Sequence, residues 1–283
     1  MNPLQKSLST LCLTAGALLA AAPPVWAQVS LGSASSFSVL GGTNVTCTAG
    51  VVTGDIGVAP GSAVPYTNTG CTVAGATPPA TNAAAVQARV DFLSAYASVQ
   101  SLPCTPMPGD LAGQNLAPGV YCTDAVAKAG TLTLTGPAGG VWIFLVNGAL
   151  TGTNFSVAMA GGGQPCNVYW APTGAATLTD SALKGNLLAG DATIGSITLT
   201  RGTLAGRAMS SVALTMTGAS IIGCGALTEP GTPSCRDKDH HGHHGDKGHK
   251  GCDRDGDKHD RDCDKPRSGH HNPFKPNDKD HKS

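Results

Sequence analysis

Three stretches of this sequence repeat one pattern: Thr177-Leu178-Thr179-Asp180-Ser181-Ala182-Leu183, Thr198-Leu199-Thr200-Arg201-Gly202-Thr203-Leu204 and Thr215-Met216-Thr217-Gly218-Ala219-Ser220-Ile221. The shared order is threonine, an apolar residue, threonine, any residue, a small residue, a small or hydroxyl residue, and an aliphatic residue. A looser copy, Thr151-Gly152-Thr153-Asn154-Phe155-Ser156-Val157, precedes them. An approximate repeat of about 20 residues, with alternating β-branched residues and intervening glycines, is typical of a chain that coils into stacked strands. We therefore predict a β-solenoid.

The alternation within each copy also suggests a surface. Side chains of a strand point to opposite faces in turn, so Leu178, Leu199 and Met216 are expected in the core and the flanking threonines in solvent. In stacked coils, equivalent threonines of neighbouring strands would lie about 4.7–4.9 Å apart. Two successive threonines of one strand would lie about 6.6 Å apart. The pattern predicts a flat, rigid, uncharged grid of methyl and hydroxyl groups, which suits a partner that is itself a lattice.

The N-terminus has the three parts of a secretory signal peptide. Lys6 precedes an apolar run over residues 11–22, and Val25-Trp26-Ala27 offers a cleavage site after Ala27. The apolar run is too short for a confident membrane span, and no later stretch is long enough. We predict a signal peptide over 1–27 and a secreted, extracellular mature protein that does not enter a membrane.

Charge divides the rest of the chain into two parts. The net charge is +0, but all nine histidines and most charged residues lie in a tail that we place at 229–283. The body, 28–228, is almost uncharged and has no long basic face, which argues against a nucleic-acid partner. Its length suits one domain, and an aromatic content of 4% fits a narrow aliphatic core. A monomer without a cofactor is expected.

The tail is poor in hydrophobic residues and is predicted to be disordered. His240, His241, His243 and His244, with Cys252 nearby, suggest weak binding of a divalent transition metal such as zinc, copper or nickel. The alternative is a solvating polyampholyte without a specific ligand.

Ten cysteines are present, and nine remain once Cys12 is lost with the signal peptide. In an exported protein they indicate disulfides, each worth about 2–4 kcal/mol. The natural candidates by proximity, or by clasping the repeat region, are Cys47 with Cys71, Cys104 with Cys122, and Cys166 with Cys224. The sequence alone leaves the connectivity open.

One helix interrupts the β pattern. Thr81 or Asn82 can cap a helix that runs to about Ser101. Val86, Val90, Leu93 and Ala97 recur at helical spacing and are expected to form its buried stripe. We predict that the helix lies along the solenoid and packs on the continuously apolar strand at 141–146, rather than on a membrane.

A β-solenoid also occurs in enzymes that cleave polysaccharides, whose sites need clustered carboxylates. The acidic residues of the body are spread singly, and only Asp180 and Asp191 are candidates to meet in space. These positions are Asp55, Asp91, Asp110, Asp124, Asp180 and Asp191. We expect no enzyme activity. A non-catalytic adhesive or structural surface protein remains an alternative, since disulfides and a rigid solenoid would serve it equally.

Several phrases, in order, carry a resemblance to a known family. They are Leu31-Gly32, Phe37-Ser38-Val39-Leu40, Gly54-Asp55-Ile56-Gly57-Val58, the helix, Pro118-Gly119-Val120-Tyr121, Trp142-Ile143-Phe144, Cys166-Asn167-Val168-Tyr169-Trp170, Gly185-Asn186 and Gly206-Arg207-Ala208. Over residues 29–223 the chain resembles the DUF3494 family of microbial ice-binding (antifreeze) proteins. The resemblance implies a right-handed, discontinuous β-solenoid of triangular cross-section with one long helix alongside.

The resemblance also implies that one flat face, rich in Thr, Ser and Ala, adsorbs to the ice crystal surface and inhibits ice growth and recrystallisation. Carried over by pattern, the ice-binding candidates are Thr177, Thr179, Ser181, Thr198, Thr200, Thr203, Thr215, Thr217 and Ser220. Asp180 and Arg201 share one repeat position. If that position lies on the flat surface, the two charges would interrupt it.

Overall fold

The computed structural model describes residues 29–59, 66–79, 81–107, 110–124 and 127–227. The predicted signal peptide, the predicted tail and its candidate metal-binding histidines lie outside these residues. Within the described part of the chain, no helix combines the length and hydropathy needed to cross a membrane.

The described chain is a β-solenoid with one long helix, α1 (Asn82–Gln100), and short 3-10 turns at Gly32–Ser36, Pro165–Asn167 and Cys224–Ala226. All recorded strand pairings are parallel, as expected when successive coils stack in one direction. The strands are β1 (Phe37–Gly41), β2 (Asn44–Thr48), β3 (Val51–Thr53), β4 (Asp55–Val58), β5 (Tyr66–Thr69), β6 (Thr72–Ala74), β7 (Thr105–Pro106), β8 (Asn115–Leu116), β9 (Gly119–Asp124), β10 (Ala127–Thr135), β11 (Trp142–Asn147), β12 (Leu150–Ala160), β13 (Val168–Pro172), β14 (Ala176–Ala189), β15 (Ile197–Ser210), β16 (Ala213–Thr217) and β17 (Ser220–Ile222).

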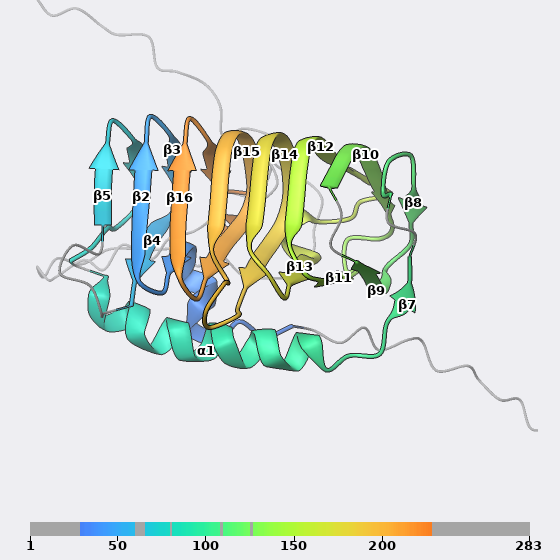
Figure 1. Ribbon diagram of the computed structural model, residues 1–283, viewed down its shortest axis with the longest axis horizontal. Coiled ribbons are helices and arrows are strands. Elements are labelled where there is room, and N and C mark those ends of the chain that lie inside the picture. The colour runs from blue at the N-terminus through green and yellow to red at the C-terminus, as the bar shows by residue number, and fades with distance from the viewer. Residues whose placement is uncertain (1–28, 60–65, 80, 108–109, 125–126, 228–283) are drawn as a thin grey trace, which may run out of the picture. The chain divides into compact units, whose positions relative to one another are not determined.

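The coils are not stacked in sequence order, so the predicted discontinuity is confirmed. Strands β1 to β6 build one end of the solenoid, and α1 then runs back along its length (Figure 1). From β7 onward the chain coils towards its own beginning, until β16 pairs with β2, β17 with β3 and β15 with β1. The first and last coils are therefore hydrogen-bonded neighbours, which closes the ladder between them.

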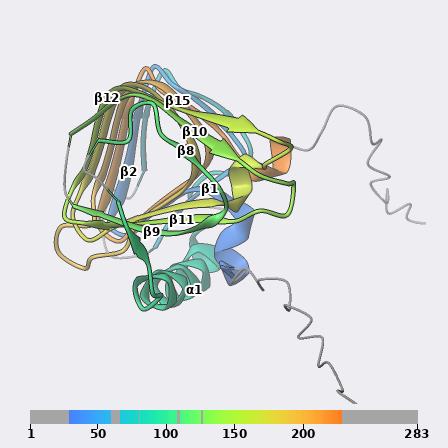
Figure 2. The same ribbon diagram turned by 90° about the vertical axis from the view of Figure 1, so that its right-hand side faces the viewer.

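Each coil has three sides (Figure 2). The first, which Figure 1 shows from the front, contains β5, β2, β16 and the first parts of β15, β14 and β12. The second side contains β6, β3, β17, the following parts of β15, β14 and β12, and β10. The helix side contains β4, β1, the ends of β15 and β14, then β13, β11 and β9, and it carries α1.

The predicted packing of α1 on the apolar strand at 141–146 is confirmed, but the predicted buried stripe of the helix is wrong. The buried residues are Ala85, Ala88, Phe92, Ala95 and Val99, which pack against the helix side. The predicted Val86 and Val90 are instead 46% and 58% exposed. Three of the five buried residues are alanines, whose small side chains let the helix backbone approach the sheet closely.

The helix begins as predicted near Thr81, but the expected side-chain cap is absent there. The Thr81 hydroxyl donates instead to the carbonyl oxygen of Ile56 at 2.7 Å and so ties the helix start to β4.

All three candidate disulfides are present, with sequence separations of 24, 18 and 58 residues for Cys47–Cys71, Cys104–Cys122 and Cys166–Cys224. The first lies beneath the first side, because Cys47 points into the core from β2 and Cys71 lies in the coil formed by β5 and β6. It therefore ties the end coil to its neighbour.

Candidate functional site

The first side of the solenoid carries two straight columns of threonine. The pairing register places threonine opposite threonine on six neighbouring strands, at two positions of each strand. One column consists of Thr67, Thr46, Thr215, Thr198, Thr177 and Thr151, and the other of Thr69, Thr48, Thr217, Thr200, Thr179 and Thr153. We call these twelve residues the threonine face.

Inward-facing residues hold these threonines outward. On β16, for example, Leu214 and Met216 are fully buried. Thr215, which lies between them, and Thr217, which follows Met216, reach solvent. Most other strands repeat this arrangement, since a period of two separates core from surface positions. The predicted orientation of Leu178, Leu199 and Met216 into the core is confirmed.

The register fixes the dimensions of the grid. Threonines of one strand lie about 6.6 Å apart, neighbouring strands lie about 4.8 Å apart, and six strands span about 24 Å. Hydrogen bonds between strands and a close-packed aliphatic core hold these spacings, so the grid exists before any partner arrives.

The hydroxyl groups of the face are available to a partner. Over the described ranges, none of the twelve threonine side chains forms a hydrogen bond or ion pair with another protein group. All twelve are at least partly exposed. On the second side, by contrast, the hydroxyls of Thr131 and Ser156 bond to each other at 2.7 Å.

In each of the six coils that form the threonine face, the residue directly after the second threonine column is left-handed. Asn154, Asp180, Arg201 and Ala49 have φ values of 53°, 50°, 56° and 50°, and Gly218 and Gly70 occupy the same position with φ values of 61° and 75°. A left-handed residue turns the chain sharply, which explains why each strand leaves the flat face directly after its second threonine.

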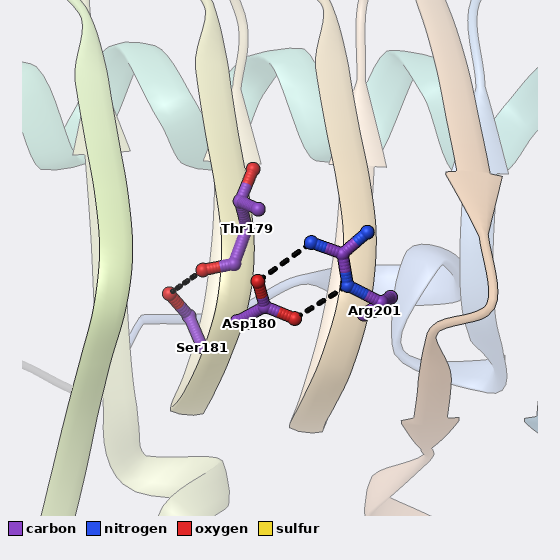
Figure 3. Close-up of polar contacts among 4 residues, drawn as sticks. All are labelled: Thr179, Asp180, Ser181 and Arg201. Carbon is purple, nitrogen blue, oxygen red and sulfur yellow. Dashed lines mark hydrogen bonds and ion pairs between the residues drawn. The ribbon is translucent and has the colours of Figure 1, made fainter.

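Asp180 and Arg201, which would interrupt the face if they lay on the flat surface, lie at this corner and bind each other. Arg201 donates from Nε and Nη2 to the two carboxylate oxygens of Asp180, both at 2.6 Å (Figure 3). The hydrogen bonds from Arg201 hold the pKa of the Asp180 carboxyl below its usual range, so the pair is ionised at neutral pH. Neither residue belongs to the threonine columns.

Three of the nine candidate residues lie outside the two threonine columns. Ser181 is only 4% exposed, because it turns inward after the corner, where its hydroxyl donates to the Thr179 carbonyl and accepts from the Phe155 amide. Thr203 and Ser220 are paired neighbours beyond the corner, on the second side. The other six candidates, Thr177, Thr179, Thr198, Thr200, Thr215 and Thr217, lie together in the two columns.

Half of the face was missed by sequence reasoning. Thr46, Thr48, Thr67 and Thr69 come from the N-terminal coils, and Thr151 and Thr153 belong to the copy that was considered loose. A search for two threonines separated by one residue would have found all three pairs. What it could not supply is that β2, far away in sequence, stacks directly on β16.

The remaining sides are less suited to a flat partner. The second side mixes hydroxyl groups with Lys184 and with Val51 and Ile222, which are 45% and 37% exposed. The helix side is covered by α1. The threonine face is regular along its whole length and has no charged member.

Most carboxylates of the described residues accept hydrogen bonds from separate partners rather than from one another's neighbours in a single cluster. Asp55 accepts from the Ala76 amide, Asp91 from Ser33 and Gln87, and Asp191 from the residues that follow it in a turn. Hydrogen bonds lower the pKa of Asp91 and of Asp191. Asp180 is paired with Arg201. No three His, Cys, Asp or Glu side chains gather into a metal site within the described ranges.

Comparison with known proteins gives consistent matches. A family model described as Ice-binding-like matches residues 39–222. An ice-binding protein of Nostoc sp. (strain HG1) is 38% identical over 180 residues, covering 61% of this chain and 64% of that protein. An ice-binding protein of Flavobacterium frigoris (strain PS1) is 31% identical over 206 residues, covering 66% of this chain and 74% of that protein.

Among solved structures, the ice-binding protein of the Antarctic ascomycete Antarctomyces psychrotrophicus matches with a TM-score of 0.60 and 28% identity, covering 68% of this chain and 97% of that one. This chain thus spans nearly the whole of that fold and just under two thirds of the length of the Nostoc relative.

Proposed function

The chain belongs to the Ice-binding-like family, and we propose that it adsorbs to ice through the threonine face, slowing ice growth and recrystallisation. One observation carries the choice of face. Twelve threonines lie in register on six strands, and in the described structure none of their hydroxyls is used inside the protein.

Adsorption on such a face needs no chemistry. The grid is fixed beforehand, so little conformational entropy is lost on docking, which is where preorganised surfaces gain affinity. A single hydroxyl contributes only about 0.5–1.5 kcal/mol net through a hydrogen bond. When twelve threonine hydroxyls and their neighbouring methyl groups contact one crystal plane, simultaneous loss of all contacts is rare.

We further propose that the protein acts outside the cell. The sequence of segment 1–27 predicts a signal peptide, and the three disulfides suit an oxidising compartment. A right-handed coil, which the resemblance to the family implies, and a monomeric, non-catalytic state complete the proposal. The single, scattered acidic residues of the body support the non-catalytic state.

The direct test is ice recrystallisation inhibition by the mature chain, 28–283, at micromolar concentration. Inhibition by the folded chain, but not by the same sample after heat denaturation and disulfide reduction, is the expected result. A chain with native circular dichroism that does not inhibit recrystallisation would refute ice binding, and adhesion would become the leading function.

A further inference from the structure

At the corner that borders the threonine face, the described residues of six coils include one pair of opposite charges and no further charged residue. Along the left-handed corner, six coils contribute Gly70, Ala49, Gly218, Arg201, Asp180 and Asn154 in that spatial order. The two charged members are neighbours near the middle of the row, and each directly follows a threonine of the second column.

We propose that Asp180 and Arg201 form the border of the ice-binding surface and that their mutual neutralisation is required for tight docking. The inference rests on the proposed function. In this proposal the pair keeps the border of the face electrically neutral. Neither side chain belongs to the grid that contacts ice.

The geometry of the pair supports this role. Two parallel hydrogen bonds of 2.6 Å join the guanidinium to the carboxylate, the two-pronged arrangement that satisfies both groups at once (Figure 3). Arg201 and Asp180 keep 60% and 39% of their side-chain surface exposed. An exposed pair of this kind contributes little to folding, because solvent screens the two charges. A large stabilising role is therefore not expected from it.

Docking changes the surroundings of the corner. When ice approaches Thr179 and Thr200, liquid water is displaced beside the two residues that follow them, and an ice lattice does not solvate a charge by reorienting as liquid water does. A single uncompensated charge would lose hydration without replacement, which is costly. A pair with zero net charge, already hydrogen-bonded internally, loses much less. Removing one partner is therefore expected to cost more than removing both.

The test uses the mature chain and three variants: Asp180→Asn, Arg201→Gln, and both together. Asn is among the residues that tolerate left-handed backbone, and Gln keeps much of the arginine stem. We expect each single variant to lower thermal hysteresis at equal concentration by about fivefold, because one charge is left uncompensated. The double variant is expected to stay within about twofold of the parent.

Lys184→Gln is the matched control for net charge. It removes one positive charge from β14, as Arg201→Gln removes one from β15, but it lies beyond the corner on the second side. We expect it to leave thermal hysteresis unchanged. Melting curves of all variants should agree within a few degrees, since the pair is exposed.

The outcomes separate this inference from the proposed function. An inactive parent would refute ice binding itself. An active parent with unaffected single variants would refute the role of the pair. Equal losses in the single and double variants would also refute it, because they would show that the side chains matter individually and that charge balance does not.

Discussion

The double substitution Thr200→Tyr/Thr217→Tyr is expected to lower thermal hysteresis at least about tenfold, because it builds a steric clash against the flat partner. Both threonines lie side by side in the second column, on β15 and β16. A tyrosine ring there would rise several ångströms above the plane and hold ice away from the neighbouring threonines. Tyrosine is favoured in strands, so folding should be unaffected.

The same strands provide the matched control, Thr203→Tyr/Ser220→Tyr. Each of these residues follows its partner in the first variant by three positions, and the two are paired with each other on the second side. We expect the control to keep full activity. Loss of activity in the control, with retention in the Thr200/Thr217 variant, would move the ice-binding surface to the second side.

The second large effect concerns the core that keeps the grid rigid. Trp170 is fully buried, stacks on Phe144 with ring centroids 4.1 Å apart, and meets Phe155 edge-on at 6.0 Å. Its indole nitrogen donates to the Lys184 carbonyl at 2.9 Å. Trp170→Ala would leave a large cavity that the stacked strands cannot close, and should cost about 3–5 kcal/mol of unfolding free energy.

Chemical denaturation of the parent and variant measures this cost. Trp170→Phe is the control, because it keeps a ring in the stack and gives up the indole hydrogen bond, worth about 1 kcal/mol. Well below its melting temperature, Trp170→Ala should still bind ice, since the threonines themselves are unchanged. A loss of stability under about 1 kcal/mol would show that the aromatic stack is not a main support of the solenoid.

The repeat at 177–221 predicted the solenoid because periodicity and strand alternation are local properties of the sequence. The six central threonines followed for the same reason. Disulfide candidates at Cys47, Cys71 and the four other positions were also found correctly, because two of the pairs are close in sequence and the third flanks the repeat region.

What the repeat did not predict depends on contacts between distant segments and on backbone conformation. The N-terminal strand β2 joins the face only because the last coil closes on the first. Ser181 is buried because Asp180 adopts a left-handed conformation and turns the next side chain inward. The helix was assigned the wrong stripe because valine is more apolar than alanine, whereas close packing on the sheet favours the smaller residue.

The most direct test of the threonine face is solid-state NMR on isotopically labelled protein in frozen solution, following magnetisation transfer from ice protons to assigned threonine methyl groups. Transfer to the methyl groups of the two columns, Thr46 and Thr198 among them, with none to Thr203 or Thr72 on the second side, is the result expected here. Transfer to the second side, with the two columns remaining in contact only with unfrozen water, would contradict the assignment of the face.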